Sequence, residues 1–131
     1  MKTERHRILI VDDDYVMRML LKKIINSNFA GVSVVTTCSG QQGWTEFDAD
    51  QIRPDLVLTD LGMETPLAGL ELAQKIRAVS PPTPIILISA GDLRNVDVGN
   101  FNCCLEKPFR AADLVRKIAY LLNLQAQGKN N

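Results

Sequence analysis

Residues 8–18 read ILIVDDDYVMR, so four apolar residues run directly into three adjacent carboxylates. An apolar run without alternation, rich in β-branched side chains, is typical of a strand that is buried on both faces of a parallel sheet. Neighbouring carboxylates repel one another, and each favours the protonated form of the next. The run Asp12, Asp13 and Asp14 therefore indicates that a positive group lies at the end of this strand.

The chain beyond this stretch alternates between helical and strand patterns. From residue 16 the apolar spacing becomes three and four residues, which predicts an amphipathic helix ending near residues 26–28. Further short apolar runs predict four more strands, at 32–36, 56–59, 85–88 and 103–106. Helical patterns follow the second, third and fifth strands, the first of these with Ser39 as its N-cap. The sequence thus predicts an α/β fold with a doubly wound parallel sheet and right-handed crossovers.

The composition fits one globular domain. Of the 131 residues, 46% are apolar and 23% are charged, with 15 basic and 15 acidic side chains. A chain of this length buries a sufficient core without disulfides or a structural metal. We expect a lead-in over residues 1–7, one domain over residues 8–124 and a frayed tail over residues 125–131.

The charge and the cysteines narrow the classes of function. The formal net charge is zero, so we expect no direct DNA binding and no membrane association. The three cysteines lack the spacing of metal ligands, and no apolar segment approaches the roughly 20 residues that a membrane span needs. We expect a cytoplasmic protein that is a monomer or a weak dimer.

Polar residues directly follow four of the predicted strands. Asp12 and Asp13 follow the first strand, Asp60 the third, Ser89 the fourth and Lys107 the fifth. In a doubly wound sheet, the loops at the carboxyl ends of the strands form the binding site. A hard cation with oxygen ligands would neutralise the carboxylates, and Mg²⁺ needs only one or two of them as direct ligands. The sequence therefore predicts a magnesium site at this edge.

Such a site suits phosphoryl transfer. This reaction needs mainly positioning and charge neutralisation, and carboxylates form aspartyl-phosphate intermediates. Asp60 stands alone after the middle strand, so it is the candidate nucleophile. Ser89 and Lys107 would hold the transferred group by a hydrogen bond and by a point charge.

Four motifs carry a family resemblance when taken together and in order. They are ILIVDDD (8–14), PDLVLTDLGM (54–63), PIILISA (84–90) and LEKPF (105–109). The chain resembles the receiver domain of two-component response regulators, and in particular the chemotaxis regulators. The resemblance implies a flavodoxin-like five-stranded parallel sheet in the order 2-1-3-4-5.

The resemblance also implies a function. A histidine kinase, or a phosphotransfer protein, would donate a phosphoryl group from its phosphohistidine to Asp60, and binding of a downstream protein target would change. Asp13, Asp60 and the main-chain carbonyl of Gly62 are expected on Mg²⁺, with Asp12 acting through water. The domain would be a switch that phosphorylates and dephosphorylates itself, and not an enzyme that turns over external substrates.

Of the remaining site positions, two match the family and one departs from it. Ser89 takes the position of the switch hydroxyl, and Lys107 matches the family lysine, whose peptide bond to Pro108 is often cis in the family. The aromatic residue usual three positions before that lysine is replaced by Cys104. Phe101 is close enough in sequence to be considered as a substitute for this ring.

Two segments depart from the family pattern. Between the fourth and fifth strands the chain is shorter than usual by roughly one helical turn, which predicts a shortened or irregular fourth helix. After Asp60, the usual proline position holds Glu64, and Pro66 is displaced. We expect the loop after the third strand to bulge.

Glycines lie two residues after both Asp60 and Ser89, at Gly62 and Gly91. They leave little side chain over a phosphoryl group on Asp60. We hypothesise easy access for water and a short-lived aspartyl phosphate.

Three alternative functions are weighed against the phosphorylated switch. An aspartate-nucleophile phosphatase of the haloacid dehalogenase type would need an acid where Gly62 stands. A flavodoxin-like cofactor binder conflicts with the acidic cluster, which would repel a flavin phosphate, and no glycine-rich cradle follows the first strand. A non-phosphorylated receiver-like interaction module is the third, because Cys104 and the shortened fourth helix would disable ordinary switching.

Overall fold

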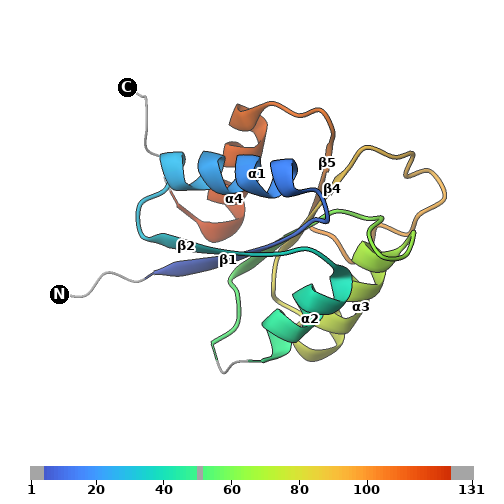
Figure 1. Ribbon diagram of the computed structural model, residues 1–131. Helices are drawn as coiled ribbons and strands as arrows, with labels where there is room; N and C mark the ends of the chain where they lie inside the picture. The colour runs from blue at the N-terminus through green and yellow to red at the C-terminus, as the bar shows by residue number, and fades with distance from the viewer. Residues whose placement is uncertain (1–4, 50–51, 125–131) are drawn as a thin grey trace.

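The computed structural model describes residues 5–49 and 52–124, and over these residues a five-stranded parallel sheet carries two helices on each face (Figure 1). The strand order is β2-β1-β3-β4-β5, which confirms the predicted fold and order. The strands are β1 (His6–Val11), β2 (Val32–Thr37), β3 (Leu56–Thr59), β4 (Ile85–Ser89) and β5 (Cys103–Glu106). The helices are α1 (Tyr15–Asn28), α2 (Gly40–Asp48), α3 (Ala68–Val79) and α4 (Ala111–Leu122). The tail predicted over residues 125–131 and the first four residues of the predicted lead-in lie outside the described residues.

Both faces of the central strands are buried, which explains their unbroken apolar runs. Ile8 and Ile10 of β1 pack toward α1 and α4, whereas Leu9 and Val11 pack toward α2 and α3. Every residue of β3 and of β4 is buried. Side chains alternate between the faces of a strand, so a strand covered on both faces needs apolar residues at every position.

Side-chain caps set the start of two helices. The Val16 backbone N–H donates to Asp14 Oδ1 at 3.1 Å, so Asp14 is the N-cap of α1. Ser39 caps α2 as predicted, its Oγ accepting from the N–H of Gln42 at 3.0 Å. Gly43 lowers the helix propensity of α2, but a Cβ at Gly43 would lie only 2.8 Å from a methyl group of Val11. The glycine thus lets α2 pack closely against β1.

The fourth crossover contains no helix: residues 90–102 form turns and bends. The sequence predicted a shortened or irregular fourth helix, and here the shortening is complete, so the label α4 belongs to the C-terminal helix. Leu93, Val96 and Phe101 from this segment pack against the apolar cluster under α2 and α3. Apolar contacts therefore anchor the segment to the sheet without regular secondary structure.

None of the helices over residues 5–49 and 52–124 has the length and the apolar character that crossing a membrane requires.

Candidate functional site

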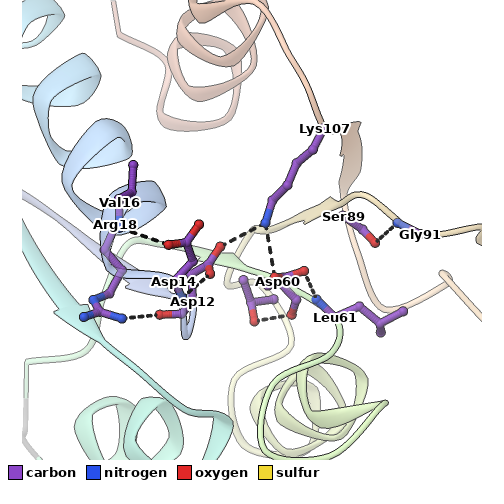
Figure 2. A network of polar contacts seen from close by, with 10 residues as sticks. Asp12, Asp14, Val16, Arg18, Asp60, Leu61, Ser89, Gly91 and Lys107 are labelled. Carbon is purple, nitrogen blue, oxygen red and sulfur yellow. Dashed lines mark hydrogen bonds and ion pairs between the residues drawn. The ribbon is translucent and has the colours of Figure 1, made fainter.

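Charged side chains from three strand ends meet at one edge of the sheet (Figure 2). Asp12 and Asp13 follow β1, Asp60 follows β3 and Lys107 follows β5. Lys107 Nζ lies 3.2 Å from Asp12 Oδ2 and 3.2 Å from Asp60 Oδ2, so it bridges the two carboxylates. The peptide bond between Lys107 and Pro108 is cis.

The three carboxylates form a cluster that fits a divalent cation. One oxygen atom from each of Asp12, Asp13 and Asp60 lies within 4.8 Å of the others. Asp12 is 1% exposed, Asp60 is half-buried and Asp13 is exposed, so the cluster runs from the interior to the solvent. Oxygen donors that also leave room for water are the set that Mg²⁺ prefers in proteins.

Burial and the neighbouring opposite charges shift the pKa values of Asp12 and Lys107 in opposite directions. Burial raises the pKa of Asp12, and this effect outweighs the hydrogen bond from the Asp14 N–H and the charge of Lys107, which both lower it. For Lys107, burial lowers the pKa, but the charges of Asp12 and Asp60 and its bonds to them raise it above the usual value. The Lys107 ammonium thus pairs with two of the three clustered carboxylates, and the site favours a further positive charge.

The Asp60 carboxylate is oriented from both sides. Its Oδ1 accepts a hydrogen bond from the N–H of Leu61 at 2.7 Å, and its Oδ2 faces Lys107. The backbone of Asp60 is fixed by an N–H bond to the carbonyl of Val11 at 3.0 Å, and its carbonyl accepts from the hydroxyl of Thr59 at 2.8 Å. With 16% of the side chain exposed, Asp60 is held in place and still open to a reactant.

Ser89 ends β4 at the same edge, and its hydroxyl bonds to the loop that follows. Ser89 is 4% exposed, and its Oγ accepts from the N–H of Gly91 at 3.1 Å (Figure 2). The carbonyl of Ser89 accepts from the N–H of Lys107 at 2.9 Å, which joins the ends of β4 and β5. The hydroxyl thus lies at the same edge of the sheet as the acidic cluster and accepts a hydrogen bond from Gly91.

The loop after Asp60 spans residues 61–67 and is held by backbone hydrogen bonds before α3 begins. The N–H of Met63 donates to the carbonyl of Thr65 at 2.9 Å, and the N–H of Gly69 donates to the carbonyl of Leu61 at 2.7 Å. Gly62, the predicted backbone ligand, is exposed in this loop, two residues beyond Asp60.

Cys104 lies in the middle of β5, opposite Leu87, and is exposed. Together with Ser89, Leu93 and neighbouring residues it lines a cavity of about 510 Å³, and none of the described residues lining this cavity is aromatic. Phe101, the possible substitute for the missing ring, is instead buried in the apolar cluster under α2 and α3. Among residues 5–49 and 52–124, no aromatic ring therefore lines this cavity with Ser89.

The sequence did not indicate a functional role for two residues that lie near the site. Arg18 donates from Nη1 to the carbonyl of Asp12 at 2.8 Å. Glu64 accepts two backbone hydrogen bonds from the start of α2. Because Arg18 lies one helical turn beyond Asp14, its position near the acidic run could have been inferred from the sequence. The partners of Glu64 lie too far away in sequence to be inferred.

Sequence comparison with known proteins gives matches over most of the chain. The family model of the response regulator receiver domain matches residues 8–119. Response regulator MprA of Mycolicibacterium vanbaalenii is 32% identical over 120 residues, which cover 88% of this chain and 50% of MprA. Protein RcaC of Microchaete diplosiphon is 32% identical over 133 residues, covering 95% of this chain and 19% of RcaC. The chain thus spans half or less of the length of these relatives.

Solved structures extend the comparison to the fold. A response regulator receiver domain protein from Clostridium thermocellum has a TM-score of 0.79 at 27% identity, covering 90% of this chain and 94% of that one. Response regulator TrrA from Thermotoga maritima, in complex with Mg(2+)-BeF, has a TM-score of 0.78 at 30% identity, and the match covers 88% of this chain and 98% of TrrA. The chain therefore belongs to the family of response regulator receiver domains.

Proposed function

We propose that this receiver domain accepts a phosphoryl group on Asp60 from the phosphohistidine of a histidine kinase or a phosphotransfer protein. The observation that carries the proposal is the bridge from Lys107 Nζ to Asp12 and Asp60 beside a third carboxylate. The donor's P–N bond breaks as an Asp60 oxygen forms the new P–O bond, and the released imidazole takes up a proton from solvent. Hydrolysis later breaks the P–O bond, which restores the carboxylate and releases phosphate.

Asp13, Asp60 and the main-chain carbonyl of Gly62 would hold Mg²⁺ directly, with Asp12 acting through water. The acidic cluster and the Mg(2+)-BeF complex of the similar protein TrrA support this assignment. When bound, the ion supplies positive charge that offsets the charge on the phosphoryl oxygens. Arg18 holds the backbone of Asp12 through its carbonyl, so the buried acid keeps its orientation.

Lys107 and Ser89 would respond to the phosphoryl group. The ammonium of Lys107 lies within reach of Asp60, so it turns to a phosphoryl oxygen once the carboxylate is phosphorylated. Ser89 exchanges its bond with the Gly91 N–H for a bond to the phosphoryl group. This exchange releases the start of the segment 90–102, and the change is passed to a downstream protein target through protein contacts without an aromatic ring at Cys104.

Incubation with Mg²⁺ and a small phosphodonor, followed by intact mass measurement, tests the proposed function. The wild type is expected to gain the mass of one phosphoryl group, and Asp60→Asn is expected to gain none because the amide is not a nucleophile. An unchanged mass for the wild type, under conditions that label other receivers, would instead favour a non-phosphorylated interaction module.

Replacement of Asp13 by asparagine is expected to weaken Mg²⁺ binding by about tenfold or more, because a charged oxygen ligand is lost. The same change is expected to raise the unfolding temperature in EDTA, since one of three clustered like charges is removed. Isothermal titration calorimetry and thermal melts measure the two effects. Asp14→Asn is the matched control, because asparagine also caps a helix and Asp14 is not in the cluster. Equal Mg²⁺ affinity of Asp13→Asn and the wild type contradicts the assignment.

Glutamine at both Gly62 and Gly91 is expected to lengthen the lifetime of the aspartyl phosphate by about tenfold, equivalent to about 1.4 kcal/mol in the barrier. A Cβ at Gly62 would lie 3.4 Å from the Pro66 carbonyl, and one at Gly91 would lie 3.7 Å from Ser89 Oγ. Both positions thus accept a side chain, which would cover the phosphoryl group and restrict water. Decay of the phosphorylated protein is followed by mass, with the double alanine variant as control. A wild-type lifetime of many hours, or an unchanged lifetime in the glutamine variant, refutes the prediction.

A further inference from the structure

A side chain from the loop after β3 binds the start of helix α2. Glu64 Oε1 accepts a hydrogen bond from the N–H of Gly40 at 2.7 Å, and Oε2 accepts from the N–H of Gln41 at 2.8 Å. These partners are 24 and 23 residues away in sequence, so the contact joins the loop after β3 to the start of α2. A carboxylate at a helix N-terminus also interacts favourably with the helix dipole.

Every N–H group in the first turn of α2 has a partner. The N–H of Gln42 donates to Ser39 Oγ at 3.0 Å, and the N–H of Gly43 donates to the carbonyl of Ser39 at 2.9 Å. Glu64 satisfies the other two, so half of the N-terminal donors of α2 depend on a residue outside the helix and its cap. Burial raises the pKa of Glu64, but the hydrogen bonds from backbone N–H groups, that of Gly40 foremost, bring it below the usual value.

The packing around Gly40 leaves room for this contact and for little else. A Cβ at Gly40 would lie 3.2 Å from both the Cβ and the carbonyl oxygen of Ala68, and 3.3 Å from Glu64 Oε2. The start of α2 therefore lies directly against the start of α3. This close approach fixes the distance that the Glu64 side chain spans.

The contact connects two segments that flank the acidic cluster, the start of α2 and the loop after β3. On one side, β2, which precedes α2, is bound to the cluster because the carbonyl of its last residue, Thr37, accepts from the N–H of Asp12 at 3.1 Å. On the other side, Glu64 lies two residues after Gly62, in the loop that leaves Asp60. A constraint on Glu64 is thus a constraint on the backbone around Gly62.

We propose that Glu64 is a positioning residue: by binding the start of α2, it holds the Gly62 loop in the conformation that completes the Mg²⁺ site. This role rests on the proposed function. It predicts that loss of the Glu64 carboxylate weakens Mg²⁺ binding, because the loop must then be ordered when the ion binds. At saturating Mg²⁺ the loop is ordered by the ion itself, so the phosphorylation rate recovers.

The Glu64→Ala variant is expected to raise the dissociation constant for Mg²⁺ by about tenfold, which lies in the usual range for groups that orient metal ligands. Its phosphorylation rate at saturating Mg²⁺ is expected to stay within about threefold of the wild type, equivalent to a barrier change of less than about 0.7 kcal/mol. Calorimetric Mg²⁺ titration and labelling by a small phosphodonor give the two readouts. Glu64→Gln keeps the side-chain length and one acceptor oxygen, so it is expected to show a smaller rise and also serves if Glu64→Ala does not fold.

Two controls separate positioning from general stability and from charge. Ser39→Ala removes a different hydrogen bond from the same turn of α2 and leaves Glu64 in place, so it is expected to lower the unfolding temperature without changing Mg²⁺ affinity. Glu71→Gln removes an exposed carboxylate from the first turn of α3 and is expected to leave Mg²⁺ affinity unchanged.

The outcomes distinguish failure of the proposed role of Glu64 from failure of the proposed function of the domain. If the wild type binds Mg²⁺ and is labelled, but Glu64→Ala binds the ion as tightly, the role of Glu64 is refuted and the proposed function stands. Equal losses of Mg²⁺ affinity in Ser39→Ala and Glu64→Ala also refute it, because Glu64 would then act only through the stability of α2. If the wild type neither binds Mg²⁺ nor is labelled, the proposed function fails and the role of Glu64 fails with it.

Discussion

Replacing Gly69 by alanine is expected to lower the free energy of unfolding by about 3 kcal/mol, at the upper end of the usual cost of overpacking. A Cβ at Gly69 would lie 1.9 Å from the carbonyl oxygen of Asp60, 2.9 Å from its carbonyl carbon and 3.0 Å from the Cα of Leu61. All three atoms belong to the backbone, so no side chain can rotate away. The backbone at Asp60 must shift instead, and the variant is expected to lose most phosphoryl acceptance as well.

Urea unfolding followed by circular dichroism measures the effect on stability. Gly91→Ala is the matched control, because a Cβ there would have, among the described residues, only Ser89 Oγ within contact range, at 3.7 Å. Gly91→Ala is expected to stay within about 0.5 kcal/mol of the wild type, as surface substitutions usually do. A Gly69→Ala variant as stable as the control would show that the approach of α3 to Asp60 is not as close as described.

Replacing Lys107 by methionine is expected to slow phosphorylation of Asp60 by about 100-fold, the usual scale for removing one charge-stabilising group from a reaction site. Methionine keeps much of the apolar stem but removes the ammonium that bridges Asp12 and Asp60. Without Mg²⁺, the variant is also expected to lose about 2 kcal/mol of stability, because the buried Asp12 carboxylate is left without its cation while the site stays partly open to solvent.

Labelling by a small phosphodonor at saturating Mg²⁺ and urea unfolding in EDTA measure the two effects of Lys107→Met. Lys23→Met, on the exposed surface of α1, removes an equal charge away from the described ion pairs and is expected to change neither. Labelling of Lys107→Met at the wild-type rate would remove the lysine from the proposed mechanism.

The sheet was predictable from the sequence because each central strand is buried on both faces. Residues 8–11 are at most 1% exposed, and the strand pattern there is an unbroken apolar run. The polar residues that directly follow these apolar runs could also be identified from the sequence. Since parallel strands end at one edge, this placement anticipates the meeting of Asp12, Asp60 and Lys107, although the roles of these residues remain proposals.

Features that depend on contacts between segments far apart in the chain could not be predicted from the sequence. Nothing in the polar stretch 90–102 shows that Val96 and Phe101 pack into the core in place of a helix. The bonds from Glu64 to the start of α2 depend on the close approach at Gly40, which only the assembled fold creates. The hydroxyl of Ser89 was predicted at the right edge, but its bond to Gly91 depends on the turn that replaces the fourth helix.

The dependence of phosphorylation on free Mg²⁺ tests whether the acidic edge works as a metal-assisted phosphoryl acceptor. The initial rate of labelling of the wild type is measured with a small phosphodonor over a series of free Mg²⁺ concentrations and in EDTA. We predict a rate that rises to saturation, with its midpoint at the dissociation constant found by calorimetry, and that falls to background in EDTA. Labelling at the same rate in EDTA would contradict the role of Asp12, Asp13 and Asp60 as a shared cation site.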